Sequence, residues 1–219
     1  MKILVTGFDP FGGEAVNPAF EAVKQLPNAI AGAEVIKLEL PTAFKRSAQV
    51  LEQAIKEHMP NAVLCVGQAG GRAKMTVEKV AINLGEARIP DNDDDQPIDE
   101  PLISDGETAY FSTLPIKAMV WQMNQGGIPA GVSYSAGTYV CNSIMYHALY
   151  LAQKEFQGLR AGFIHVPFAP EQVVDKTLVT PSMSLSDIAK GLELSIQAMV
   201  QYYNDEEAEL IKVILGTTH

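Results

Sequence analysis

The chain alternates short apolar runs with stretches of helical periodicity, and this alternation constrains its fold more than any other feature. Strands are expected in the apolar runs at 2–8, 33–40, 62–68, 130–136 and 160–167. Helices are expected at 17–26, with Asn17 as N-cap before Pro18, and at 44–59 and 116–126. Two more are expected after residue 141 and after a capping box of Ser184 and Asp187. Strands that alternate with helices predict an α/β protein, here one domain over 1–219 built as a three-layer α/β/α sandwich on a mostly parallel, mixed sheet.

Two further segments fit this pattern less simply. The segment at 74–84 alternates apolar and polar residues, and we expect it to form one strand. The segment at 88–109 is acidic and rich in turn residues, so we expect a solvated loop. A calcium-binding loop that starts at Asp91 is excluded, because Gln96 stands where such a loop needs its glycine.

Composition and charge limit the class of protein. Of the 219 residues 47% are hydrophobic, and no apolar run approaches the ~20 residues of a membrane span. A net charge of −10 without a basic stripe argues against a nucleic-acid partner. Two cysteines do not make a disulfide framework, so we expect free thiols in a reducing compartment. The sequence therefore predicts a cytoplasmic protein that binds neither membrane nor nucleic acid.

The stretch SAGTYVCNSIMYH at 135–147 places Cys141 where a strand gives way to a helix. Free backbone N–H groups and the helix dipole at a helix start favour the reactive thiolate form of a cysteine. Cys141 is therefore a candidate nucleophile, and the alternative is a small apolar filler at the helix start. Cys65 lies inside an apolar run and is expected to be a core residue.

A cysteine nucleophile needs a base, and the chain has four histidines. His165 lies near the carboxyl end of a predicted buried strand, where the catalytic groups of open α/β sheets gather. His147 lies about 240° round the predicted helix from Cys141. His58 ends a predicted exposed helix, and His219 is the last residue. His165 is thus the candidate base, with a core histidine satisfied by backbone as the alternative.

A third group usually orients a histidine base. Glu78 lies inside the alternating segment at 74–84, where a glutamate is disfavoured unless it is paired. We take Glu78 as the candidate for this role. The alternative is an outward-facing side chain on a half-exposed strand, like the neighbouring Lys79.

Two glycine-rich turns, at 6–13 and 67–72, each follow a predicted buried strand. Neither matches the dinucleotide-binding or the P-loop motif, so close backbone approach to a small ligand is their expected use. Phe8 and Phe11 lie in the first turn. They either cap the core or form an apolar slot for a flat ring.

These residues stand in motifs that resemble the pyroglutamyl peptidase I family. The family's glutamate signature, G-x-x-G-x(4)-apolar-[ST]-x-E-[KR]-x-A-x-N, is matched from Gly67 to Asn83. The cysteine signature is matched by SAGTYVCN and the histidine signature by GFIHVPF, while TGFDPFGG and ARIPDN match as well. The motifs stand in the expected order and span essentially the whole chain.

The resemblance implies a cysteine peptidase of phosphorylase/hydrolase-like fold that removes an N-terminal pyroglutamate (5-oxoproline) from peptides through an acyl-enzyme. It implies no metal and no cofactor, and a homotetramer, to which the apolar segment at 208–216 would contribute. The implied triad is Cys141, His165 and Glu78. The implied substrate-binding residues are Phe8, Phe11, Asn17, Gln68, Arg88, Ile89, Tyr139 and Val140. Tyr139 departs from the phenylalanine that is common at this position in the family.

Two other functions stay open on the residues alone. A nucleoside-phosphorylase-like enzyme of the same broad fold would need basic residues around the glycine turns, where Arg72 and Arg88 are the candidates. It would leave Cys141 without a role. A non-catalytic small-molecule binder would keep its function after loss of the thiol.

Overall fold

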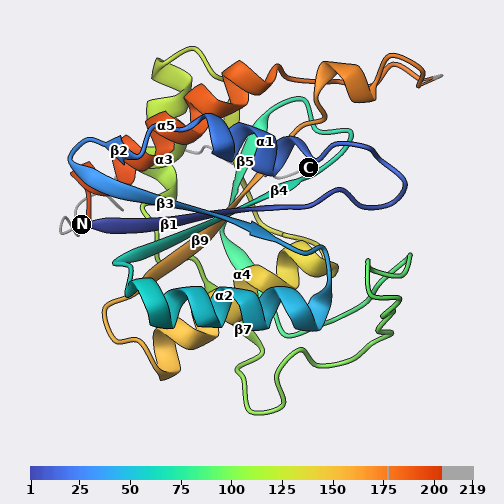
Figure 1. Cartoon of the computed structure of the whole chain (residues 1–219), viewed down its shortest axis with the longest axis vertical. Helices are drawn as coiled ribbons and strands as arrows, with labels where there is room; N and C mark the ends of the chain where they lie inside the picture. The colour runs from blue at the N-terminus through green and yellow to red at the C-terminus, as the bar shows by residue number, and fades with distance from the viewer. Residues whose placement is uncertain (177, 204–219) are drawn as a thin grey trace.

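The computed structural model describes residues 1–176 and 178–203, which build a layered α/β structure (Figure 1). Seven strands in this part of the chain form one sheet in the order β2-β3-β1-β4-β9-β5-β8. These strands are β1 (Lys2–Phe8), β2 (Ala29–Ile30), β3 (Ala33–Leu40), β4 (Ala62–Gln68), β5 (Met75–Glu78), β8 (Ala130–Ser133) and β9 (Arg160–Val166). Strands β6 (Val80–Ile82) and β7 (Ala109–Phe111) pair as a separate ribbon.

The large sheet is mixed, as the sequence predicts. Strands β3, β1, β4 and β9 run parallel to one another, and β8 runs parallel to β5. Strand β5 is antiparallel to β9, and the short β2 is antiparallel to β3. The β5–β9 pairing therefore brings the glutamate-bearing strand and the histidine-bearing strand together with opposite directions.

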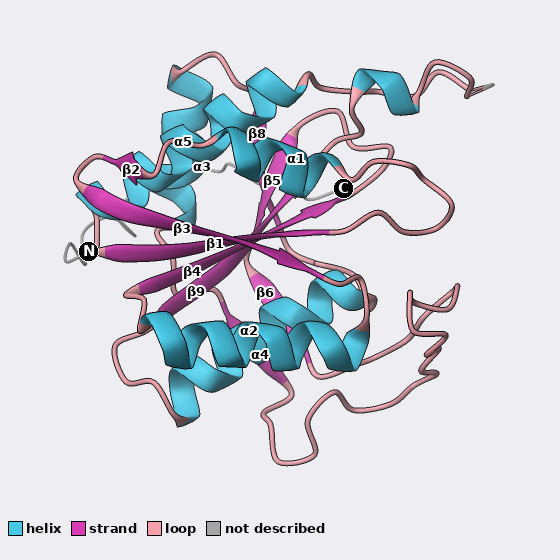
Figure 2. Cartoon of the chain, viewed as in Figure 1, coloured by secondary structure: helices cyan, strands magenta, loops and turns pink. Residues whose placement is uncertain are grey.

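Helices cover both faces of the sheet, so the expected α/β/α sandwich is confirmed (Figure 2). One face packs under α1 (Pro18–Gln25), α3 (Ile116–Gln125) and α5 (Leu185–Gln201). The other face packs under α2 (Phe44–His58) and α4 (Val140–Lys154). A short 3-10 turn, Pro170–Gln172, precedes α5. Each face has its own apolar core, and burial of this apolar surface is the main force that holds the layers together.

The segment at 74–84 is not the single strand that its alternation predicts. It divides at Lys79 between β5 in the large sheet and β6 in the ribbon. The Lys79 N–H donates to the Ser133 carbonyl at 2.8 Å, and the Lys79 carbonyl accepts from the Ser112 N–H at 2.9 Å. The prediction of one strand was wrong because alternation reports which side chains are buried and does not report which strand the backbone pairs with.

The start of α1 agrees with the prediction from the sequence, and the start of α5 agrees with it in part. Asn17 caps α1 as expected, because its Oδ1 accepts a hydrogen bond from the Ala19 N–H at 3.1 Å. At the start of α5 the Ser184 hydroxyl accepts from the Asp187 N–H at 3.1 Å and donates to the Asp187 carboxylate at 2.7 Å. Only half of the expected capping box forms, because the carboxylate takes the hydroxyl in place of the Ser184 backbone.

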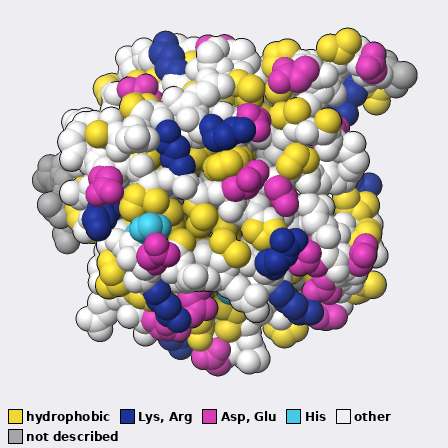
Figure 3. All heavy atoms as spheres, viewed as in Figure 1, with side chains coloured by type: hydrophobic (Ala, Val, Ile, Leu, Met, Phe, Trp, Pro, Cys, Tyr) yellow, Lys and Arg dark blue, Asp and Glu magenta, His cyan; other side chains and the backbone are white. Residues whose placement is uncertain are grey.

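The surface carries both signs of charge. On the face shown in Figure 3, acidic and basic side chains are interspersed and do not gather into a basic stripe. Among the described residues, no helix has the length and apolar character needed to cross a membrane.

Candidate active site

His165 and Glu78 form a buried hydrogen-bonded pair across the β5–β9 pairing. Thr76 lies opposite His165 in this pairing, and Glu78 lies two residues further along the same face of β5. His165 Nδ1 is 2.7 Å from Glu78 Oε1, and the two residues are 4% and 0% exposed. Because the carboxylate can only accept, the imidazole donates from Nδ1, and its Nε2 is left as the basic nitrogen.

Cys141 lies beside the strand that pairs with His165. It is the second residue of α4, and Gly67 of β4 stands in parallel register with His165. A Cβ atom built on Gly67 would lie 2.8 Å from Cys141 Sγ and 2.6 Å from the Phe163 ring. Only glycine leaves room there for both groups. The second glycine-rich turn therefore begins with a residue that lets the thiol approach the strand next to His165.

Burial favours the neutral forms of the Cys141 thiol and the His165 imidazole. Burial, with a smaller contribution from the charge of Glu78, raises the pKa of Cys141 to about 12, although Arg72 opposes this. Burial also lowers the pKa of His165 from its ordinary value, against the opposing effect of Glu78. The sequence argument from the helix start expects a thiolate. Desolvation of the thiol acts against the free N–H groups of α4, so the expected thiolate stays a prediction.

Glu78 is held as a buried carboxylate. Burial alone would raise the pKa of its carboxyl, but His165, the Ser133 side chain and Arg72 together outweigh burial and lower the pKa below its ordinary value. The alternative of an outward-facing Glu78 is wrong, because its side chain is fully buried. Lys79, next in the chain, does turn outward, and its Nζ lies 5.3 Å from the centre of the Phe111 ring.

Arg72 belongs to this site, and sequence reasoning considered it only as a phosphate ligand. Its Nη1 lies 2.7 Å from Glu78 Oε1 and also donates to the Thr76 hydroxyl. Its Nη2 is 3.5 Å from the Ser135 carbonyl oxygen. The available signal was a cation in the turn before a strand that contains a buried glutamate. No periodicity links the two residues, since the turn between them sets their distance.

The side chains proposed to contact the substrate ring come from the turn at 9–13, the segment at 88–90 and Tyr139. Phe11, in the turn after β1, lies with its ring centroid 6.2 Å from that of Tyr139, the residue before α4. The Tyr139 hydroxyl donates to the Pro90 carbonyl at 3.1 Å. Ile89 Cδ1 lies 3.7 Å from the position of a Cβ built on Gly12. The turn at 9–13 and the segment at 88–90 therefore approach each other beside Tyr139.

The other predicted contact residues differ in what their side chains can offer. Phe8 is 2% exposed and packs in the core under α2 and α4, as the core-capping alternative for this residue expects. The Asn17 amide is used within the fold, because its Nδ2 donates to the Asp9 carbonyl at 2.9 Å. Gln68 Oε1 accepts from Gln172 Nε2 at 2.9 Å. Val140 is buried and Arg88 is exposed.

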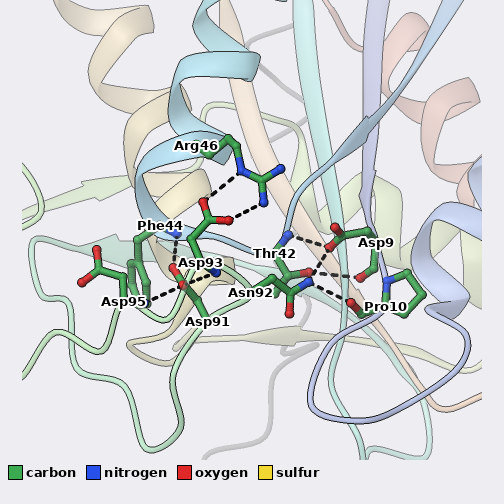
Figure 4. Close-up of polar contacts among 9 residues, drawn as sticks. All are labelled: Asp9, Pro10, Thr42, Phe44, Arg46, Asp91, Asn92, Asp93 and Asp95. Carbon is green, nitrogen blue, oxygen red and sulfur yellow. Dashed lines mark hydrogen bonds and ion pairs between the residues drawn. The ribbon is translucent and has the colours of Figure 1, made fainter.

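The acidic loop beside this slot is organised around Asp91 (Figure 4). Its carboxylate accepts hydrogen bonds from the N–H groups of Phe44 at 2.8 Å, Asp93 at 2.8 Å and Asp95 at 2.9 Å. The Phe44 N–H is a free donor at the start of α2, where a carboxylate is favoured. Asp91 is buried, so the prediction of a solvated loop was wrong for this residue.

The same loop is also tied to the turn after β1 (Figure 4). Asp9 Oδ1 accepts from the Thr42 N–H at 2.6 Å and from Asn92 Nδ2 at 3.2 Å, and Asn92 Nδ2 also donates to the Pro10 carbonyl at 2.9 Å. These bonds fix the spacing between the two segments that carry Phe11 and Ile89.

A thiol at a helix start beside a buried histidine–carboxylate pair, on an α/β sheet, is the arrangement of a cysteine-dependent hydrolase. The model of the pyroglutamyl peptidase family matches residues 1–202. The chain is 58% identical to a pyrrolidone-carboxylate peptidase of Streptococcus suis over 219 residues, all of both chains. It is 60% identical to that of Clostridium perfringens over 205 residues, 94% of this chain and 96% of the relative.

Solved structures agree with these matches. The pyrrolidone carboxyl peptidase from Thermococcus litoralis has a TM-score of 0.93 at 42% identity, covering 98% of this chain and 99% of that one. Pyroglutamyl peptidase I of Bacillus amyloliquefaciens has a TM-score of 0.89 at 46% identity, covering 93% and 98%. The chain belongs to the pyroglutamyl peptidase family, as its motifs predict.

Proposed function

We propose that the protein, working as one peptidase domain, hydrolyses the bond after an N-terminal pyroglutamate of a peptide. Cys141 is the nucleophile, His165 the general base and acid, and Glu78 the group that orients the imidazole. The observation that carries this proposal is the buried 2.7 Å bond between His165 Nδ1 and Glu78 Oε1, next to strand β4, where Cys141 Sγ lies against Gly67. The family relationship supports the substrate.

The chemistry follows from the neutral resting state. As Cys141 Sγ attacks the carbonyl carbon, His165 Nε2 takes the thiol proton, and Glu78 stabilises the imidazolium. Backbone N–H groups at the start of α4 hold the oxyanion, with Arg88 nearby. His165 then gives the proton to the leaving amine, which departs and leaves a thioester. Water attacks the thioester with His165 as base, and pyroglutamate and the free thiol are released.

The slot beside Tyr139 suits a small neutral ring. Pyroglutamate is a flat lactam without a free amine, so apolar contacts and a few backbone hydrogen bonds are enough to bind it. We assign the ring contacts to Phe11, Ile89 and Tyr139, with Phe8 behind them. Backbone groups at Gln68 and Val140 serve the lactam. Asn17 contributes by holding the Asp9 segment, since its own amide is occupied.

The two rival functions have less support. A phosphorylase-like enzyme needs free cations, but Arg72 is paired with the buried Glu78. A binder that works without chemistry gives no reason for a hydrogen-bonded histidine–carboxylate pair next to a thiol.

We further propose that the protein works in the cytoplasm and as a homotetramer. A catalytic thiol must stay reduced, and Cys65 and Cys141 are both free. The large exposed side chains of Phe111, Trp121 and Tyr134 are candidates for subunit contacts. The segment at 208–216 lies outside the described residues. Light scattering should give a mass near four times 23.7 kDa, and a monomer at micromolar concentration would contradict the tetramer.

The decisive experiment measures kcat/KM on matched pyroglutamyl, prolyl and glutamyl amides that release a chromophore. The pyroglutamyl amide should be preferred roughly a thousandfold or more over the glutamyl amide, because an open chain buries charges without partners. The prolyl amide should also react very poorly, since its amine is charged and it lacks the lactam carbonyl. Similar values for pyroglutamyl and prolyl amides would show that the slot reads only the shape of the ring. Iodoacetamide should remove the activity, whereas a non-catalytic binder would keep its ligand.

A further inference from the structure

We propose that Arg72 is a positioning residue that holds Glu78 aimed at His165 and balances its charge, so that the site is a chain of four groups, Arg72–Glu78–His165–Cys141. The inference rests on the proposed function, because it assigns Arg72 a part in the same reaction. It replaces the role of phosphate ligand that the sequence left open for Arg72.

The contacts of Arg72 fix both the position and the direction of the carboxylate. Arg72 comes from the turn between β4 and β5, and its Nη1 reaches Glu78 Oε1 and the Thr76 hydroxyl. Thr76 and Glu78 lie on the same face of β5. A planar guanidinium that bridges two side chains of one strand face restricts the rotation of both. Nη2 is anchored from the other side by the Ser135 carbonyl.

A single oxygen of Glu78 receives both donors. Oε1 is 2.7 Å from His165 Nδ1 and 2.7 Å from Arg72 Nη1. Oε2 is buried and receives no hydrogen bond from the residues that the structure describes. A buried carboxylate is stable only with a charged partner or several donors. His165 is neutral at rest, so Arg72 is the permanent counter-charge of this carboxylate.

The position of Arg72 also affects the two reacting groups. The charged groups that act on His165 are Glu78 from β5 and Arg72 from the preceding turn, and both also act on Cys141 from α4. The positive charge of Arg72 opposes protonation of His165 and favours the Cys141 thiolate. Without Arg72, Glu78 would act on His165 unopposed, and His165 would hold its proton to higher pH.

Arg72 can be tested without touching the substrate slot. For Arg72→Met we expect kcat to fall about tenfold, as is typical when a group that orients a functional side chain is removed. KM should change little. The acid limb of the kcat/KM profile should move to higher pH, because His165 loses the opposing charge. If Arg72 served only for packing, Arg72→Met would lower the amount of active enzyme, and the acid limb of its kcat/KM profile would stay at the wild-type pH.

A matched control and two rescue experiments complete the test. Arg160→Met removes an arginine from the opposite end of the strand that carries His165, and it should leave the profile unchanged. Arg72→Lys keeps the charge, so its acid limb should stay at the wild-type pH while kcat falls. The Arg72 side chain is 30% exposed and borders a cavity of about 510 Å³. Millimolar guanidinium should therefore restore part of the activity of Arg72→Ala.

The outcomes separate this inference from the proposed function. An unmoved acid limb in a folded Arg72→Met protein, or a displaced limb in Arg72→Lys, would overturn the role of Arg72. If circular dichroism shows that Arg72→Met does not fold, the position of the acid limb in the kcat/KM profile of Arg72→Lys decides whether Arg72 has this role. Loss of all activity in Cys141→Ala together with a normal Arg72→Met profile would leave the peptidase intact and reject only the positioning role. Activity that survives in Cys141→Ala would reject both.

Discussion

Two ion-pair networks in this molecule use the same kinds of side chain in opposite surroundings. In one, Arg72 pairs with Glu78, whose side chain is 0% exposed. In the other, Arg46 lies 2.5 Å from Asp93, and the two side chains are 50% and 41% exposed (Figure 4). Water and salt screen the second pair and solvate each partner when they separate. The Glu78 carboxylate has no such substitute, so loss of Arg72 would leave it buried without its permanent charged partner.

Burial of the carboxylate is what allows an arginine–carboxylate pair in this molecule to affect chemistry. Glu78 combines burial, a cation and a histidine. Asp91 lies between the two extremes, since it is buried but held by backbone N–H groups. We therefore expect substitutions to act on chemistry at Glu78, on stability at Asp91, and on very little at Arg46.

The largest effect is expected at the thiol that ends the buried network. Cys141→Ala should abolish hydrolysis of a pyroglutamyl amide, because it removes the thiol that attacks the carbonyl carbon in the proposed mechanism. Cys65→Ala is the matched control and should keep most of the activity, since Cys65 lies fully buried in β4. Steady-state assays on both variants decide the point, and a slow but real turnover by Cys141→Ala would end the mechanism.

The next effect compares one carboxylate from each network. Glu78→Gln should lower kcat by ~10²-fold or more, because the amide cannot stabilise the imidazolium of His165. Asp93→Asn makes the same chemical change in the exposed pair and should leave kcat within about twofold, as expected for a screened pair. If kcat fell equally in the two variants, burial could not explain why the Glu78 pair matters and the Asp93 pair does not.

The pH profile tests the charge state that burial imposes. Catalysis requires neutral His165, so kcat/KM rises as the pH increases through the pKa of this residue. Burial places that pKa below its ordinary value of 6.5, and the midpoint of this rise should therefore lie below pH 6.5. The pKa of Cys141 is raised to about 12, so its alkylation rate should still be rising at pH 9. An alkylation plateau at neutral pH would show a preformed thiolate and contradict the neutral resting site.

A smaller effect is expected at the buried carboxylate of the acidic loop. Asp91→Ala removes the acceptor of three backbone donors and should lower the free energy of unfolding by about 1–3 kcal/mol. KM should rise more than kcat falls, because Ile89 two residues earlier lies in the slot wall. Denaturant unfolding with Asp95→Ala as control measures this effect. If Asp91→Ala and Asp95→Ala had the same free energy of unfolding, the Asp91 carboxylate would contribute no more to stability than an exposed charge.

The smallest effect is expected at Arg46. Arg46→Ala breaks only the exposed pair with Asp93, so the midpoint of thermal unfolding and the kinetic constants should match the parent protein. A clear loss of stability or activity would mean that the loop at 91–95 depends on its surface charges, and the contrast between the two networks would fail.

Local patterns in the sequence were sufficient to predict most of the helices and strands. Apolar runs and helical periods gave the elements of the large sheet and its covering layers, and Asn17 was identified as a cap from its position before a proline. The division of 74–84 at Lys79 was missed, because two strands in different sheets can share one alternating pattern. The burial of Asp91 was missed for a related reason, since its three donors come partly from α2, far away in the chain.

The candidate site also has features that local sequence predicts and features that it does not. By itself the sequence determined the motifs that place a cysteine at a helix start, a histidine near the end of a strand and a glutamate in an apolar strand. Those are properties of neighbouring residues. The fold brings Arg72 and His165 to one oxygen of Glu78, and burial in the fold raises the pKa of the Cys141 thiol. Charge state depends on how much water the fold removes and on which distant groups it brings within a few ångströms, and neither is recorded in local sequence.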